Sequence, residues 1–471
     1  MGLGVALRVY AFVRIPVASD AAEYGVMADS FLRRGEFWMP YGLSWDDTWT
    51  PAHSHHYPPV YPIYLAPFVA AFGLSPFAIK VGAMTASLAL LAVVYFLTGR
   101  LYGVKRAEWV TALLALDPVL IITTGTGYGE SLVALLFVVT IFAIVKSVDS
   151  PPWILLAGFA AGLTYLTKSS LGPFFLIAGV AGFAWRFYYV RWAVLRDRYY
   201  LGAIAVFLGL AAVWALRNLN YFWSGSPGSF WESWQTSRHL ADAEHLVQQD
   251  LGGFTFVMVA RLPLIIALFL LVAAPWLRDL RRLPKLSDQK VSVLWLAVGL
   301  TFLLAWIISS MFWVLERNAI WWVDLSRYTA VASPVILWLA VHRQDVSSKA
   351  FKRKAAAAAT ISIAVCVAMF SYPTPGVFDA YEALKERAEP GEVVALDHVP
   401  KYEAMVHLEG SGLRLVPYVN GTSAEYVISG SPDPKYPGFT LVGVYGDSDG
   451  SALIPGFGAS LWENENRSRG N

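Results

Sequence analysis

The chain has 471 residues, of which 56% are apolar and only 15% charged, and its formal net charge is +2. This apolar composition excludes an ordinary soluble protein. The near-zero net charge leaves no basic face to neutralise phosphates along a strand, which argues against a nucleic-acid partner. The only cysteine, Cys366, excludes an intramolecular disulfide.

Apolar segments follow one another along residues 1–370, and most are long enough to cross a hydrocarbon core of about 30 Å as helices. An initial span before Ala18 and the later segments give about 11 crossings by hydropathy. Clusters of Lys and Arg separate them, and the positive-inside rule places these clusters in the cytoplasm. The later spans are predicted at Phe77–Leu97, Val110–Thr123, Leu132–Val145, Ile154–Leu166, Pro173–Ala184, Leu201–Asn218, Phe254–Leu277, Val291–Trp313, Tyr328–Val341 and Ala355–Phe370.

Two apolar segments are too short for this scheme. Tyr61–Phe72 follows a Pro-Pro pair, and a crossing there would put every later basic cluster on the wrong side. We therefore predict a surface or re-entrant helix that packs against protein. The first span is short and contains Arg8 and Arg14, which a missing N-terminal stretch or an upstream start would explain; no cleavable signal peptide is visible.

The character of the chain changes after Phe370. Residues 371–376 are rich in Pro and Gly, which is typical of a linker, and the remaining ~100 residues have the size of a small domain. A helix is predicted at Phe378–Ala388, with strands at Val393–Leu396, Tyr426–Ile428 and Thr440–Tyr445. The predicted fold is thus an all-α polytopic membrane domain, 1–370, followed by a small extracytoplasmic α/β domain, 371–471.

The first external loop, residues 18–60, gathers acidic and histidine side chains. Asp20 directly follows the first span, and Glu23 lies one helical turn further on, so both share a face if a surface helix begins there. This arrangement suits sugar transfer from a lipid-linked phosphate, because a carboxylate can take the proton of an acceptor hydroxyl. The phosphate leaving group needs cations rather than a general acid. We therefore predict that Asp20 and Glu23 are catalytic.

Cations are expected where the phosphate would lie. Lys168, Arg217 and Arg327 all occupy predicted outer ends of spans, from which long cationic side chains reach the headgroups. The alternative role for each of them is an ordinary snorkelling anchor at the membrane surface.

Several segments, in this order, resemble the GT-C membrane glycosyltransferases, above all the protein O-mannosyltransferase and lipid A aminoarabinose transferase superfamily. The resemblance implies an inverting transferase that uses a polyprenyl-phosphate sugar at an extracytoplasmic site. It would make Asp20 the catalytic carboxylate, Glu130 the outer-face acid, and Lys168, Arg217 and Arg327 candidates for the donor phosphate. The segments that carry it are Ser19–Tyr24, His56–Pro62, Tyr128–Ser131, Gly162–Lys168, Trp214–Asn218 and Arg327–Tyr328.

The chain departs from the family pattern at two places. Ala21 follows Asp20 where family members often have a second acid, so acceptor handling differs unless Glu23 replaces that acid. Ser169 and Ser170 follow Lys168 in place of Pro-Glu, which weakens the assignment of Lys168.

The loop histidines raise the question of a metal ion. His53, His55 and His56, with Asp46 and Asp47, offer ligands for Zn²⁺ or Mn²⁺, but their spacing matches no metal signature. We favour a hydrogen bond from His56 to donor or acceptor, and we assign no cofactor or metal site. The predicted substrate-binding residues are Tyr24, Asp46, Asp47, His55, His56, Tyr57, Glu130, Lys168, Arg217, Arg327 and Tyr328.

The expected partners are a polyprenyl-phosphate sugar donor, membrane lipids and an acceptor on protein, lipid or glycan. The expected location is a prokaryotic plasma membrane that the chain crosses many times. A transporter or lipid-carrier flippase is the alternative function, but transporters place ionisable groups near the bilayer midplane, and charged residues here mostly avoid span centres. A purely structural or sensory membrane protein would not need the loop acid and the outer cations together.

Overall fold

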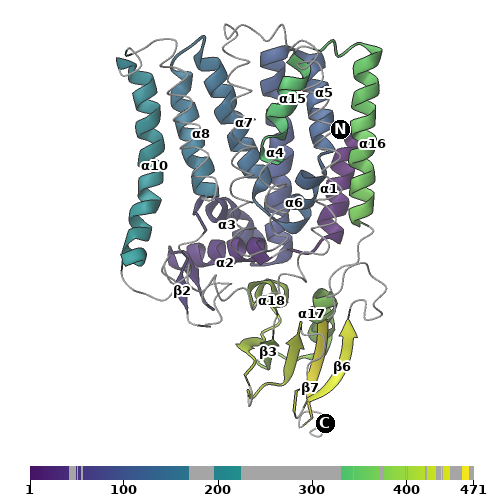
Figure 1. Cartoon of the computed structure of the whole chain (residues 1–471). Coiled ribbons are helices and arrows are strands. Elements are labelled where there is room, and N and C mark those ends of the chain that lie inside the picture. The colour runs from purple at the N-terminus through teal and green to yellow at the C-terminus, as the bar shows by residue number, and fades with distance from the viewer. Residues whose placement is uncertain are drawn as a thin grey trace, which may run out of the picture.

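The structure is a computed structural model in which a helical bundle carries a smaller α/β unit at one end (Figure 1). The α/β unit, here called the C-terminal unit, comprises the described residues between 376 and 465. The structure describes residues 1–17, 19–41, 49, 51–54, 57–168, 192, 196–223, 330–342, 344–370, 376–397, 399, 401–419, 422–430, 436–437, 439–445 and 459–465.

Within these ranges, the bundle contains three helices that are long and apolar enough to cross a membrane, or four if one bent pair counts as a span. The three lie at Pro76–Tyr102, Glu130–Ser147 and Arg198–Asn218, close to three predicted spans. Three further predicted spans, Pro173–Ala184, Phe254–Leu277 and Val291–Trp313, lie outside the described residues, so the total of about 11 stays a prediction. The bundle helices are α1 (Gly2–Arg14), α4 (Pro76–Tyr102), α5 (Val104–Ala115), α6 (Pro118–Thr126), α7 (Glu130–Ser147), α8 (Trp153–Thr167), α10 (Arg198–Trp223), α15 (Ser333–His342) and α16 (Lys349–Phe370).

The span predicted at Val110–Thr123 is not one straight helix: the chain there forms two helices, α5 and α6, bent by 55°, which together are apolar and long enough for a broken span. Pro118 starts α6 and has no N–H to continue the hydrogen bonds of α5. Asp117 caps the new helix, since its Oδ1 accepts hydrogen bonds from the N–H groups of Val119 at 3.0 Å and Leu120 at 3.3 Å.

A buried arginine from α1 lies beside this break. Arg8 is fully buried, and its Nε donates to Ser87 Oγ at 2.8 Å while Nη1 donates to the carbonyls of Gly4 and Ala115. Asp117 Oδ2 accepts a hydrogen bond from Ser333 Oγ at 2.7 Å. Arg8 and Asp117 are therefore exceptions to the expectation that charged side chains avoid the spans. Their contacts satisfy backbone groups that the helix break would otherwise leave exposed to an apolar interior.

Two helices close the end of the bundle that faces the C-terminal unit. α2 (Ser19–Arg34) lies crosswise over the bundle helices, and the short apolar α3 (Val60–Phe72) lies beside it (Figure 1). Between them, β1 (Trp38–Met39) pairs antiparallel with β2 (Ala52–His53). A helix does begin beside Asp20, which was the condition for Asp20 and Glu23 to share a face, and the short helix predicted after the Pro-Pro pair is confirmed.

The C-terminal unit is built on a five-stranded sheet with the order β4-β3-β5-β7-β6. β3 pairs in parallel with β4 and β5, whereas β7 is antiparallel to both β5 and β6. The three predicted strands coincide with β3, β5 and β6 to within a residue, while β4, β7 and α18 were not predicted. The elements are α17 (Gly376–Arg387), β3 (Val393–Asp397), α18 (Lys401–Leu408), β4 (Arg414–Pro417), β5 (Tyr426–Ser429), β6 (Phe439–Tyr445) and β7 (Ala459–Asn464).

Candidate active site

The two predicted catalytic acids lie on the first turns of α2. Asp20 is partly exposed, whereas Glu23 is 1% exposed and the neighbouring Tyr24 is 5% exposed. A negative side chain is favourable in the first turn because the helix dipole is positive there. One acid is therefore open to a substrate while the other is enclosed by protein.

Tyr57 links the first-loop segment to Asp20. Its hydroxyl donates a hydrogen bond to Asp20 Oδ1 at 3.2 Å. Burial raises the pKa of Tyr57 well above its usual value, and the charges of Asp20 and Glu23 raise it further. The phenol therefore keeps its proton at neutral pH and remains a donor that fixes the Asp20 carboxylate.

A row of tyrosines continues from α2 to the turn between α6 and α7. Tyr24 packs edge-on against Tyr57 and Tyr61, with ring centroids 4.7 Å and 5.0 Å apart. Tyr61 Oη then donates to the carbonyl of Gly127 at 2.6 Å. Gly127 ends α6 with φ +83°, a backbone conformation that favours glycine. This turn leads directly into Glu130, so the row ties both acidic segments together.

Glu130 and Lys168 form an ion pair between the start of α7 and the end of α8. Lys168 Nζ lies 2.6 Å from Glu130 Oε1, and the two side chains are 16% and 2% exposed. The sequence proposed both as substrate-binding residues from separate motifs, and the structure shows that they contact each other. A buried pair of this kind neutralises both charges, and a phosphate would have to share Lys168 with the carboxylate.

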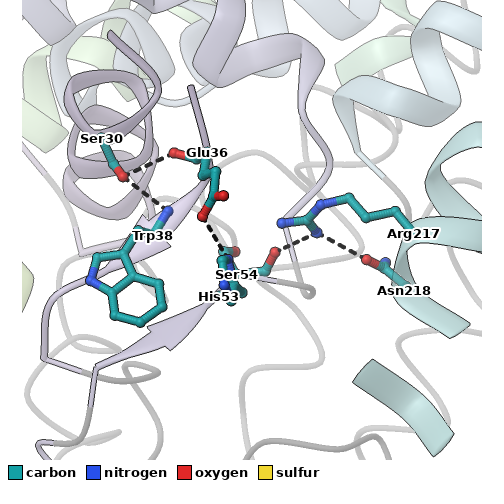
Figure 2. A network of polar contacts seen from close by, with 7 residues as sticks. All are labelled: Ser30, Glu36, Trp38, His53, Ser54, Arg217 and Asn218. Atoms are coloured by element: carbon teal, nitrogen blue, oxygen red, sulfur yellow. Dashed lines mark hydrogen bonds and ion pairs between the residues drawn. The ribbon is translucent and has the colours of Figure 1, made fainter. Parts of the chain in front are cut away.

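Arg217, near the end of α10, reaches across to the segment that contains β2 (Figure 2). Its Nη1 donates to the Ser54 carbonyl at 2.9 Å and to Asn218 Oδ1 at 3.1 Å. The guanidinium lies over the Trp214 ring at 4.6 Å and 5.8 Å from the Phe37 ring. Stacking and hydrogen bonds together hold the cation at the same end of the bundle as α2.

A second polar group in Figure 2 orders the strand pair beside Arg217. Ser30 Oγ donates to the Glu36 carbonyl at 2.9 Å and accepts from the Trp38 N–H at 3.0 Å. His53 Nδ1 lies 3.6 Å from Glu36 Oε2. These contacts anchor β1 to α2, and they place His53 against an acid of the loop.

The structure brings Asp20, Glu23, Tyr24 and Tyr57 into one group, and Glu130 and Lys168 into a second that the tyrosine row connects to it. In the part of the chain that is described, no three His, Cys, Asp or Glu side chains are placed to hold a metal ion. The remaining predicted site residues lie outside the described residues; they are Asp46, Asp47, His55, His56, Arg327 and Tyr328.

Several residues of the site were not predicted from the sequence. Trp214 precedes Arg217 by three residues on a helix, a spacing that would have suggested stacking. Tyr61 lies inside the quoted Pro-rich motif and could have been included on that ground. Phe37 and Tyr402 carried no local signal, because their contacts come from segments distant in the chain.

Comparison with solved structures shows the GT-C fold. The crystal structure of ArnT from Cupriavidus metallidurans bound to undecaprenyl phosphate is similar with a TM-score of 0.60 and 14% identity, over 98% of this chain and 96% of that one. Weaker similarities link the chain to the Archaeoglobus fulgidus oligosaccharyltransferase (TM-score 0.45, 14% identity, 91% of this chain and 67% of that one) and to the mycobacterial arabinofuranosyltransferase AftD (TM-score 0.43, 12% identity, 98% and 41%). No protein-family model and no curated protein sequence matches the chain.

Proposed function

We propose that the protein is a glycosyltransferase that moves a sugar from a polyprenyl-phosphate donor to an acceptor hydroxyl, with inversion at the anomeric carbon. The observation that carries the proposal is the grouping of Asp20, Glu130, Lys168 and Arg217 at one end of the bundle. The fold shared with ArnT, whose structure holds undecaprenyl phosphate, supports the choice of donor.

In the proposed reaction, Asp20 acts as the general base. The acceptor oxygen attacks the anomeric carbon from the face opposite the phosphate, and its proton passes to the Asp20 carboxylate. As the new carbon–oxygen bond forms, the bond from the sugar to the phosphate oxygen breaks, and polyprenyl phosphate leaves with the bonding electrons. Tyr57 holds Asp20 by its hydrogen bond and keeps the carboxylate aimed while the proton transfers.

The leaving phosphate needs positive charge rather than a proton, because it is stable as an anion. We assign this role to Lys168 and Arg217, and we retain Arg327 as a candidate from the sequence. Arg217 is held by stacking and hydrogen bonds before any ligand arrives, which lowers the cost of ordering it on binding.

We further propose that the site faces the outside of a plasma membrane and that the chain divides into two domains after residue 370.

The test is transfer from a panel of radiolabelled polyprenyl-phosphate sugars, measured with purified protein in nanodiscs that also contain extracted membrane acceptors. Asp20→Asn keeps the size and polarity of the side chain but removes the base, and we expect its turnover to fall at least 100-fold. Asp29→Asn is the matched control, since Asp29 lies on the same helix and pairs only with the exposed Arg33 in the contacts that the structure shows. Full turnover by Asp20→Asn would exclude Asp20 as the base.

A transporter is the competing function, and the helix break between α5 and α6 with its buried Arg8 is the observation that favours it. The contacts of Arg8 and Asp117 to backbone groups and serines account for both charges as structural elements. Substrate-dependent flux across liposomes that contain the protein, with no sugar transfer from any donor, would show that the protein is a transporter and not a glycosyltransferase.

A further inference from the structure

The C-terminal unit packs on the bundle through α18, whose first residues contact the first external loop. Lys401 is 5% exposed, and its Nζ lies 5.7 Å from the Trp49 ring. The Trp49 ring in turn lies 5.1 Å from the Tyr41 ring. A lysine from one part of the chain and two aromatic rings from another therefore form a single contact.

Tyr402 makes the second contact between α18 and the first external loop. It is 1% exposed, and its hydroxyl accepts a hydrogen bond from the Tyr41 N–H at 3.1 Å. Its ring belongs to the buried cluster that contains Tyr24 and Met27 of α2 and Tyr61 of α3. Tyr402 thus binds the loop directly and belongs to the same buried cluster as the helix that carries the candidate acids.

The surroundings of Tyr402 include one of those acids. Burial raises the pKa of Tyr402, and the negative charge of the nearby Glu23 raises it further, so the phenol keeps its proton. The hydroxyl therefore has a proton to donate as well as the lone pair that binds the Tyr41 amide.

We propose that α18 is a wall of the active site and that Tyr402 is a positioning residue, which holds the Tyr41 segment against the acid-bearing turns of α2. The C-terminal unit then has a function in the reaction itself, since the loop and the acids keep their relative positions only while α18 is docked. Its docking is independent of the reaction, whereas its effect on turnover rests on the proposed glycosyltransferase function.

The first measurement is hydrogen–deuterium exchange of the full-length protein in nanodiscs. Tyr402→Phe keeps the ring but removes the acceptor of the Tyr41 amide, so we expect exchange at least five times faster in residues 36–41 and faster exchange in residues 19–28. Tyr381→Phe is the matched control, because Tyr381 is also fully buried in the C-terminal unit but belongs to its internal core. Unchanged exchange in both segments of Tyr402→Phe, or the same change in Tyr381→Phe, would overturn the proposal.

The second measurement is turnover with whichever donor of the panel the wild type uses. We expect Tyr402→Phe to lower kcat about tenfold with the donor KM unchanged, and Tyr381→Phe to leave both constants unchanged. If both variants lose the same fraction of kcat and the same thermal stability, Tyr402 has only a structural role. If the wild type turns over no donor, the proposed function fails, and the exchange experiment still decides whether α18 holds the loop and α2.

Discussion

Lys168 and Glu130 contact each other across 2.6 Å, although they end and begin different helices and lie 38 residues apart in the chain. The carboxylate is almost fully buried, so the cation beside it lowers the cost of keeping it charged. Two residues that the sequence suggested as separate ligands are in fact one unit. Any substitution of either must be interpreted as a change to both.

Lys168→Met should destabilise the protein by about 3–5 kcal/mol, because it leaves the Glu130 charge in a buried place without this cation. The double variant Lys168→Met/Glu130→Gln should recover much of the loss, since neither charge then remains. Thermal unfolding in nanodiscs measures both. A double variant no more stable than the single one would show that the unpaired Glu130 charge is not the cause of the loss. A stable double variant with a donor KM at least tenfold higher would support phosphate binding by Lys168.

Arg217→Lys keeps the positive charge but removes the planar group that stacks on Trp214 and binds the Ser54 carbonyl. We expect the donor KM to rise about tenfold, which corresponds to about 1.4 kcal/mol of binding free energy. Arg198→Lys is the control, because Arg198 stacks on Tyr199 at the opposite end of the same helix. Equal effects of the two substitutions would indicate that Arg217 is only an anchor.

Tyr57→Phe removes the hydrogen bond to Asp20 and should reduce kcat about five- to tenfold, the effect of about 1 kcal/mol. The loss should appear in kcat with the donor KM unchanged, because Tyr57 contacts Asp20 rather than the groups assigned to the donor phosphate. Tyr64→Phe, on the adjacent α3, removes a hydroxyl that donates to the Gly82 carbonyl and serves as control. An unchanged kcat in Tyr57→Phe, or an equal loss in Tyr64→Phe, would show that Tyr57 does not position the base.

Gly127→Ala tests the turn that positions Glu130. At φ +83° an added Cβ is strained, and it would lie 2.7 Å from Ile79 Cγ2 and 3.2 Å from Ala21 Cβ. We expect a loss of about 2–4 kcal/mol, the sum of backbone strain and overpacking. Gly35→Ala, just after α2, also has a positive φ of +72° with nothing within 4 Å, so it should show only the backbone cost of about 1–2 kcal/mol. Equal melting temperatures of the two variants would show that contacts of the added Cβ with Ile79 and Ala21 do not destabilise the protein.

His407 of α18 should make docking of the C-terminal unit sensitive to acid. Burial, together with the charges of Lys385 on α17 and Lys80 on α4, lowers its pKa to about 3, against a hydrogen bond to the Val17 backbone that raises it. The imidazole also packs on the rings of Phe378 and Tyr381. The folded state therefore holds His407 neutral.

In the unfolded state His407 binds a proton below its ordinary pKa of 6.5, whereas in the folded state it does not. The free energy of unfolding is therefore at its full value above pH 6.5 and decreases as the pH falls toward 3. Between pH 7 and pH 5 the loss should be about 2 kcal/mol. His407→Asn removes the titration, and its melting temperature should fall less over this range than that of the wild type. Parallel curves for the two proteins would contradict this assignment.

The sequence predicted much of this architecture because local patterns determine it. Apolar runs located α4, α7 and α10, whereas a helix beginning at Asp20 was only a condition for Asp20 and Glu23 to share a face. The break before Pro118 was missed because hydropathy does not register a lost backbone donor inside an apolar run. The pairing of Glu130 with Lys168 and the docking of Tyr402 depend on tertiary contacts, which no local pattern reports.

The contact between Tyr402 and the cluster around Tyr24 also sets the order of assembly. The two residues are separated by roughly 380 positions, which a ribosome covers in about 20–80 s at about 5–20 residues per second. During that interval α2 and its acids are made while the helix that covers them has not been synthesised. A nascent chain therefore has α2 without the helix that packs on it in the full-length protein, and the buried cluster that holds Tyr24 and Met27 is complete only after Tyr402 has been synthesised.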